Sequence, residues 1–124
     1  MAGLYEDDFV CLTDSVLTVK NYYFPNKKCR RLSVEAITIL WFEEEDLGKC
    51  SYKKTWGKSQ NGIYWALDVK RCYRLISDTK KCNVVIHYGS KDLIGFTVAN
   101  AADFMESMRG VLDYHVIIVN SINL

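Results

Sequence analysis

Proline, histidine and long apolar stretches are scarce in this chain of 124 residues. One proline and seven glycines exclude collagen-like and low-complexity chains. No apolar run approaches the roughly 20 residues that a membrane-spanning helix needs. An excess of one charge sign is also missing, because 16 Lys and Arg face 15 Asp and Glu. A dedicated nucleic-acid-binding protein usually carries a strong basic excess, so nucleic acid is not an expected partner.

Signals for secretion or lipid attachment are absent from both ends of the sequence. The first residues include Glu6, Asp7 and Asp8, where a signal peptide would carry basic and then apolar residues. The start is not the Met-Gly start of N-myristoylation, and the last four residues do not form a prenylation motif. We therefore expect a cytoplasmic protein.

Catalytic and metal-binding motifs are also missing. The five cysteines include no CxxC pair, so free thiols are expected rather than a zinc site. His87 and His115 lie in no metalloprotease or catalytic-triad string, and the Gly-Lys-Ser of residues 57–59 lacks the upstream glycine of a phosphate-binding loop. The acidic run at residues 43–46 is typical of a solvated turn. We expect no enzymatic activity, no metal and no cofactor.

A composition of 49% hydrophobic and 25% charged residues is typical of a globular protein. At this length one domain buries roughly two thirds of the surface of the unfolded chain, which suffices for one core but not for two. The sequence therefore predicts a single domain over residues 1–124.

Short runs rich in β-branched and aromatic residues predict strands through most of the chain. Polar turns separate them, and a turn at residues 25–28 precedes one long strand expected at residues 32–41. The predicted strands cover residues 9–12, 16–24, 32–41, 63–67, 72–76, 83–88 and 93–98, with a short one at 52–56.

The hydrophobic period changes at Asn100. Asn100 is a good N-cap, and Asp103 favours the positive end of a helix dipole. Apolar residues then recur at helical spacing, namely Phe104, Met105, Met108, Val111 and Leu112. This pattern predicts one amphipathic helix over residues 101–112 that covers the preceding sheet. The β-branched run at residues 115–119 predicts a terminal strand.

The order of the elements and the string VLTVKNYYFPNKKCRRLSVEAITI resemble the pleckstrin-homology (PH) superfold, closest to its compact bacterial-type and GRAM-like branch. The stretch GFTVANAADFMESMRGVL looks like the last strand and helix of such domains. The resemblance covers about residues 9–112 and leaves 113–124 as a C-terminal extension. It implies a mainly β (α+β) fold: a curled antiparallel sandwich or partly open barrel of about seven strands, with one C-terminal amphipathic helix and room for an extra terminal strand.

Function is left open by this resemblance, because the superfold carries lipid binding, peptide binding and scaffolding alike. The resemblance implies a groove between an exposed strand and the terminal helix, where related branches add a peptide strand through main-chain hydrogen bonds. We therefore favour a non-catalytic interaction module that binds a protein or peptide partner. The alternative is weak binding to anionic phospholipid or phosphoinositide headgroups on a membrane surface.

Basic residues gather at a turn between two strands and in a glycine-containing loop. The first hairpin turn carries Asp14, whereas the resemblance implies a basic loop there for headgroup binding. Any lipid binding should therefore be weak and sensitive to salt. The candidate lipid- or anion-binding residues are Lys27, Lys28, Arg30, Arg31, Lys53, Lys54 and Lys58.

The apolar run near the C-terminus is unfavourable to leave in water. The run either pairs with its own sheet, which we favour, or meets another chain, including a second copy in a homo-oligomer. The candidate partner-interface residues are Val116, Ile117, Ile118 and Val119.

Overall fold

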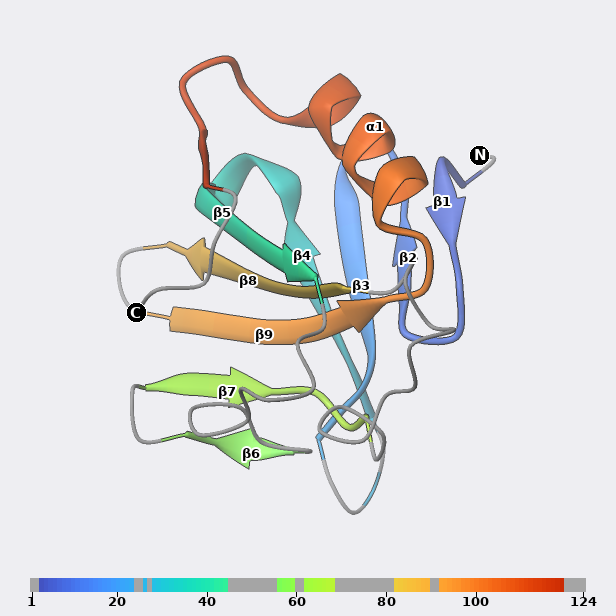
Figure 1. Ribbon diagram of the computed structural model, residues 1–124, viewed down its shortest axis with the longest axis vertical. Coiled ribbons are helices and arrows are strands. Elements are labelled where there is room, and N and C mark those ends of the chain that lie inside the picture. Colours follow the sequence, from blue (N-terminus) through green and yellow to red (C-terminus); the bar gives the residue numbers. More distant parts are fainter. Residues whose placement is uncertain are drawn as a thin grey trace.

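The structure is a computed structural model that describes residues 3–23, 26, 28–44, 56–59, 62–68, 82–89 and 92–119. Two β-sheets enclose a shared apolar core, and one α-helix lies at one end of the sandwich (Figure 1). The described strands form no closed barrel. The prediction of a mainly β fold with one helix near the C-terminus is confirmed.

The first sheet contains four antiparallel strands in the order β1-β2-β3-β4. Its strands are β1 (Tyr5–Glu6), β2 (Val10–Leu12), β3 (Val16–Tyr23) and β4 (Lys28–Ser33). Leu17 and Val19 on β3 are buried in the core while their neighbours are half-exposed, which is the alternation of a sheet with one covered face. Sequence patterning does not predict β1, because two residues are too few to show a period.

The second sheet contains six described strands in the order β10-β5-β8-β9-β7-β6. Its strands are β5 (Ile37–Glu44), β6 (Gly57–Lys58), β7 (Ile63–Trp65), β8 (Cys82–Tyr88), β9 (Asp92–Val98) and β10 (Ile117–Val119). Residues 82–86 and 94–98 are buried without alternation. This pattern is typical of strands that are covered on both faces.

The predicted β sandwich is confirmed, but two strand pairs in the second sheet are parallel rather than antiparallel as expected. β7 runs parallel to β9, and β10 runs parallel to β5. Parallel neighbours need a long connection that returns the chain to its starting end. The path from β7 to β9 passes through β8, and the path from β5 to β10 ends with α1 and the residues that follow it.

The predicted single strand over residues 32–41 is also wrong, because a 3-10 turn at Val34–Ala36 divides it into β4 and β5. The Val34 amide donates to the Ser15 carbonyl at 3.0 Å, and the Gly89 amide donates to the Ala36 carbonyl at 2.9 Å. The chain passes from the first sheet to the second at this turn. The apolar pattern continues through it because residues on both sides of the turn are buried in the same core.

The predicted helix is confirmed as α1 (Ala101–Val111), which ends one residue earlier than expected. The side chain of Asn100 caps it by accepting a hydrogen bond of 3.2 Å from the Asp103 amide. The side chains that α1 buries are Phe104, Met105 and Met108. Figure 1 shows α1 beside β1 at one end of the sandwich.

In the described part of the chain, no helix has both the length and the apolar character to span a membrane.

A second apolar cluster, separate from the shared core, contains Ile63, Trp65 and Val85. Gly95 makes this packing possible, because a Cβ atom at that position would lie 2.5 Å from the Trp65 ring.

The strand predicted at residues 63–67 is confirmed as β7, which is two residues shorter. The predicted strand at 72–76 lies outside the described residues, as does the one at 52–56 except for Trp56, which precedes β6.

Candidate functional site

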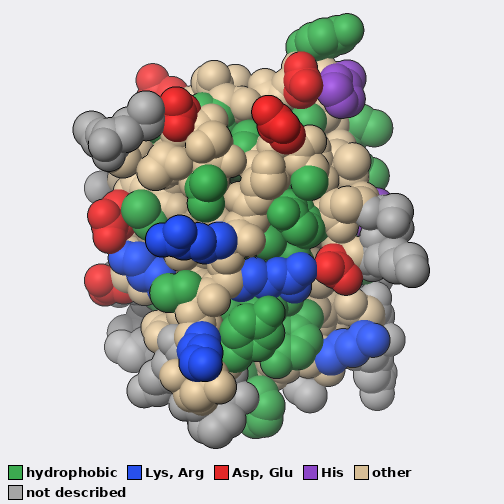
Figure 2. Space-filling view, turned by 180° about the vertical axis from the view of Figure 1, so that it is seen from behind, with side chains coloured by type: hydrophobic (Ala, Val, Ile, Leu, Met, Phe, Trp, Pro, Cys, Tyr) green, Lys and Arg blue, Asp and Glu red, His purple; other side chains and the backbone are tan. Residues whose placement is uncertain are grey.

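A cavity with charged and aromatic walls lies where β3 and β4 of the first sheet meet β6, β7 and β9 of the second. It is open to solvent and has a volume of about 220 Å³. On the face shown in Figure 2, hydrophobic side chains gather beside Lys and Arg side chains. We call the cavity the tyrosine cleft and define it by Tyr22, Tyr23, Arg30, Lys58, Tyr64 and Asp92.

A bend in β3 brings the first two tyrosines to the cleft. Asn21 has a φ of 53°, a left-handed conformation that Asn adopts more readily than most residues. The Leu67 amide donates to the Asn21 carbonyl at 3.0 Å, which ties the bend to the segment after β7. The register with β4 shifts between Val19 and Tyr23. After the bend, Tyr22 is buried and Tyr23 is exposed.

The three tyrosine rings contact one another. The centroids of Tyr22 and Tyr64 lie 4.9 Å apart, and those of Tyr22 and Tyr23 lie 5.0 Å apart with nearly perpendicular planes. Tyr22 is only 2% exposed, whereas Tyr23 is 40% exposed. Burial raises the pKa of Tyr22 to about 12, although the Arg30 charge acts in the opposite direction. Tyr22 therefore forms a neutral wall, and Tyr23 offers ring surface to a ligand.

Arg30 is fixed in place by its neighbours. Its guanidinium lies 5.3 Å from the ring centroid of Tyr22 and 5.7 Å from that of Tyr88. Nη1 donates to the Tyr22 hydroxyl at 3.3 Å, and Nη2 donates to the Asp92 carboxylate at 2.9 Å. These contacts order the long side chain before any ligand arrives, which reduces the entropy that binding would cost.

Among the described residues that line the cleft, one positive charge has no counter-ion. Asp92 forms an ion pair with Arg30. Lys58 is exposed on β6 and forms no ion pair within the described part of the chain. Two cations and one carboxylate give the described lining residues a net positive charge, which favours an anionic group beside the tyrosine rings.

The structure brings together two residues that the sequence places in separate basic clusters, Arg30 and Lys58. Lys28 and Arg31 are exposed on β4 but do not line the cleft. Lys27, Lys53 and Lys54 lie outside the described residues. Sequence reasoning missed Tyr22, Tyr23, Tyr64 and Asp92 as site residues. Aromatic and basic residues do alternate in the sequence at residues 52–58 and 64–73, but aromatic residues in strands more often fill a core.

The groove that the resemblance implies beside the terminal helix is filled where α1 faces the first sheet. β1 pairs with β2 and contacts α1. The Ser107 hydroxyl on α1 donates to the Leu4 carbonyl at 3.1 Å. Within the described residues, the chain's own N-terminal segment therefore covers the β2 edge next to the helix.

The C-terminal candidate residues dock on the chain's own sheet, which confirms the favoured interpretation of the tail. Ile117 pairs with Ile39, Ile118 with Leu40 and Val119 with Trp41. Ile117 remains 57% exposed, and Val116, Ile118 and Val119 are half-buried. A homo-oligomer formed through this tail stays a prediction.

The histidines make ordinary polar contacts. A hydrogen bond of 2.7 Å joins Thr38 Oγ1 and His87 Nδ1 across β5 and β8. His115 is exposed, with Nδ1 3.9 Å from a carboxylate oxygen of Asp113. Within the ranges that the structure describes, no three or more His, Cys, Asp or Glu side chains are grouped to hold a metal ion.

Comparison with family models, curated proteins and solved structures finds no match to this chain. The function proposed below therefore depends on the side chains of the tyrosine cleft and on the strand edge beside it.

Proposed function

We propose that this chain is a non-catalytic, PH-like interaction module that binds an extended segment of a protein partner at the tyrosine cleft. The observation that carries the proposal is the meeting of three tyrosine rings and two cations at an open cavity of about 220 Å³. Two sheets around one core, with a single α-helix near the C-terminus among the described residues, support the PH-like assignment. The two parallel strand pairs depart from the antiparallel arrangement that the resemblance implies.

The aromatic walls suit a peptide ligand. Tyrosine provides a large contact area with few rotatable bonds and a hydroxyl that tolerates water, which is why it is common at protein interfaces. Tyr23 is exposed and stands perpendicular to the buried Tyr22, so it presents one side of a shallow aromatic wall. The net positive charge favours a segment with an acidic residue next to its apolar anchor.

The edge of β4 can extend such a contact along the backbone. Within the described strands, β4 pairs only with β3, so its other edge has no strand neighbour. The Ser33 amide already donates to the Tyr88 hydroxyl at 2.9 Å, which leaves the earlier part of β4 for a partner strand. Lys28 and Arg31 on this strand would repel a second copy of the same edge and attract an acidic segment.

A random peptide library displayed on phage and selected on the full-length chain tests the proposal. Enriched peptides should combine an acidic residue with an aromatic residue or proline. Synthetic versions should lose at least tenfold in affinity for the Tyr23→Ala and Lys58→Glu variants, measured by fluorescence anisotropy. Tyr114→Ala is the matched control, because Tyr114 is 98% exposed and does not line the cleft. Peptides that bind all variants equally, or a selection without enrichment, would contradict the proposal.

The alternative, anionic lipid, is tested in the same series. Vesicles of phosphatidylcholine with phosphatidylserine and a phosphoinositide are sedimented with the wild-type chain and with the Lys28→Glu/Arg30→Glu variant. The proposal expects no more protein in the pellet than with phosphatidylcholine alone. Binding that requires anionic lipid and disappears in the double variant would instead assign the basic residues to a membrane surface.

A further inference from the structure

The N-terminal segment, residues 4–7, lies on the molecule as an added strand. The Leu4 amide donates to the Leu12 carbonyl at 2.8 Å, and the Asp7 amide donates to the Val10 carbonyl at 3.0 Å. Between these bonds, Tyr5 pairs with Leu12. Figure 1 shows β1 at the outer side of β2, next to α1. The segment thus occupies a slot whose walls are the β2 edge and the helix.

Tyr5 is the apolar anchor of this segment. Its ring meets the Phe104 ring edge-on, with centroids 5.4 Å apart. Its hydroxyl accepts a hydrogen bond of 3.0 Å from the Asn100 amide and donates one to the Asp7 carboxylate. Burial and the bond to Asp7 raise the pKa of Tyr5, so the hydroxyl stays protonated and can donate.

Asp7 is the polar anchor. Its Oδ2 accepts from the Ala99 amide at 2.8 Å, and its Oδ1 accepts from the Phe9 and Val10 amides at 2.6 and 2.9 Å. Ala99 and Asn100 form the junction between β9 and α1. The two anchors therefore bind two successive backbone amides of that junction.

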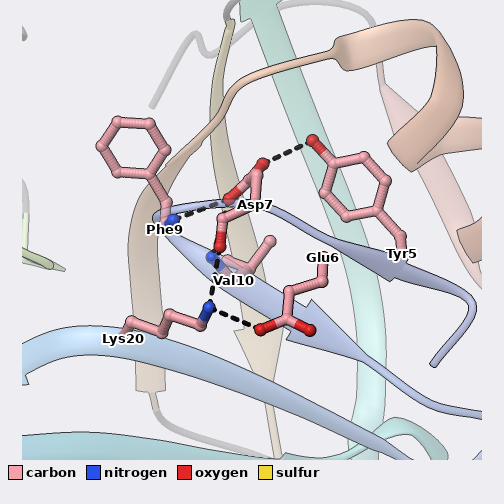
Figure 3. A network of polar contacts seen from close by, with 6 residues as sticks. All are labelled: Tyr5, Glu6, Asp7, Phe9, Val10 and Lys20. Atoms are coloured by element: carbon pink, nitrogen blue, oxygen red, sulfur yellow. Dashed lines mark hydrogen bonds and ion pairs between the residues drawn. The ribbon is translucent and has the colours of Figure 1, made fainter.

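The residue between the anchors points to solvent. Glu6 forms an ion pair of 2.8 Å with Lys20, and its side chain is 62% exposed (Figure 3). Lys20 also donates to the Asp7 carbonyl at 2.8 Å. The slot thus holds the first and third residues of the pattern Tyr-x-Asp through half-buried contacts, and the middle one only through an exposed ion pair, which contributes little.

We propose that the slot between β2 and α1 is a second peptide-binding site, selective for an extended Tyr-x-Asp segment, and that residues 4–7 occupy it in cis. A partner segment with the same pattern takes their place. The slot's own contributions are the β2 edge, the Phe104 ring and two backbone amides, and none of these requires that the segment belong to the same chain. This inference is independent of the tyrosine cleft.

The occupying segment is short enough to be replaced. β1 has two residues, and Leu4 is 48% exposed. A short tether gives the cis segment an effective concentration on the order of millimolar, so a free peptide competes poorly until the cis anchors are weakened. The affinity for a peptide in trans should therefore rise when Tyr5 and Asp7 are replaced.

A fluorescent peptide with the sequence GLYEDDFV, that of residues 3–10, tests this in the full-length chain. Fluorescence anisotropy should show at least tenfold tighter binding to the Tyr5→Ser/Asp7→Ser variant than to the wild type. The matched control chain, Glu6→Ser, should bind like the wild type. In the peptide, replacing the tyrosine or the first aspartate should abolish binding, and replacing the glutamate should not.

A second measurement covers the case in which the double variant does not fold. Millimolar peptide added to the wild-type chain should shift the NMR amide resonances of Ala99 and Asn100, where the cis anchors bind. Equal affinity for the wild type and a folded double variant would overturn the proposal, as would the absence of binding to that variant. If the double variant does not fold, unshifted Ala99 and Asn100 resonances in the wild type would overturn it.

Discussion

The slot and the tyrosine cleft are both built around tyrosines, but they differ in whether contacts within the chain satisfy their polar groups. In the slot, Tyr5 and Asp7 bind each other and two backbone amides. In the tyrosine cleft, Tyr23 is 40% exposed and Lys58 forms no ion pair within the described residues. Polar groups whose hydrogen bonds are satisfied within the chain contribute to stability, whereas an exposed ring beside an unpaired charge remains available to a ligand. Substitutions in the slot should therefore change the free energy of unfolding, and substitutions in the cleft should change ligand binding.

The largest effect should come from the floor of the slot. Phe104 is fully buried and contacts both Tyr5 and Phe96. Replacing it by alanine should lower the free energy of unfolding by about 3 to 5 kcal/mol, because it removes the ring and leaves a cavity. Urea denaturation followed by circular dichroism measures the loss. Phe104→Leu, which keeps most of the volume, should cost less than about 1.5 kcal/mol. A loss under about 1 kcal/mol for alanine would mean that the site tolerates the cavity by collapsing.

Loss of the polar anchor should have the next largest effect. Asp7→Ala leaves three backbone amides and the Tyr5 hydroxyl without their acceptor, and should destabilise the chain by about 2 kcal/mol. Asp8 is the matched control, since it is adjacent and exposed. Asp8→Ala should stay within about 0.5 kcal/mol of the wild type. Equal effects of the two substitutions would show that the Asp7 hydrogen bonds contribute no net stability.

Alkaline pH should act on the buried wall of the cleft. The pKa of Tyr22 is raised to about 12 in the folded chain from 10.0, so the folded state holds its proton more tightly than the unfolded state. The stability that this provides is complete below pH 10 and is lost as the pH rises toward 12. Urea midpoints at pH 9 and pH 11 should fall less for Tyr22→Phe than for the wild type. Identical falls would contradict the assignment of the raised pKa to this phenol.

The smallest effect on stability should come from the open side of the cleft. Tyr23→Ala should change the free energy of unfolding by no more than about 1 kcal/mol, because the side chain is 40% exposed and lies outside the buried core. The same variant should lose peptide binding. Thermal unfolding and anisotropy on one protein preparation measure both. A large loss of stability would assign Tyr23 to the fold and remove the contrast between the two regions.

The elements that could be predicted from the sequence are those with local signals. α1 was predictable because Asn100 and the apolar spacing after it lie within a few residues of one another. The break at Val34–Ala36 was not, because buried residues before and after the turn continue an alternating pattern. The parallel strand pairs were not predictable either, because they depend on which strands, far apart in the sequence, become neighbours in the sheet.

The candidate site was only half predictable for the same reason. Arg30 and Lys58 stand out as basic residues in the sequence, but nothing local brings them together. Tyr22 meets Tyr64 only because β3 bends at Asn21 and β7 lies across the sandwich from it. Such meetings are set by tertiary packing and leave no trace in a short window of sequence.

The pairing of β10 with β5 has a consequence for the order in which the chain folds. Ile39 and Ile117 are neighbours in the sheet but lie far apart in the sequence. Forming this pair closes a loop that contains most of the chain, and the entropy of closure makes such contacts slow. β10 also has few residues to hold it, so its amides should exchange with deuterium well before those of β8. We expect the last strand to dock late in folding and to be the first to detach.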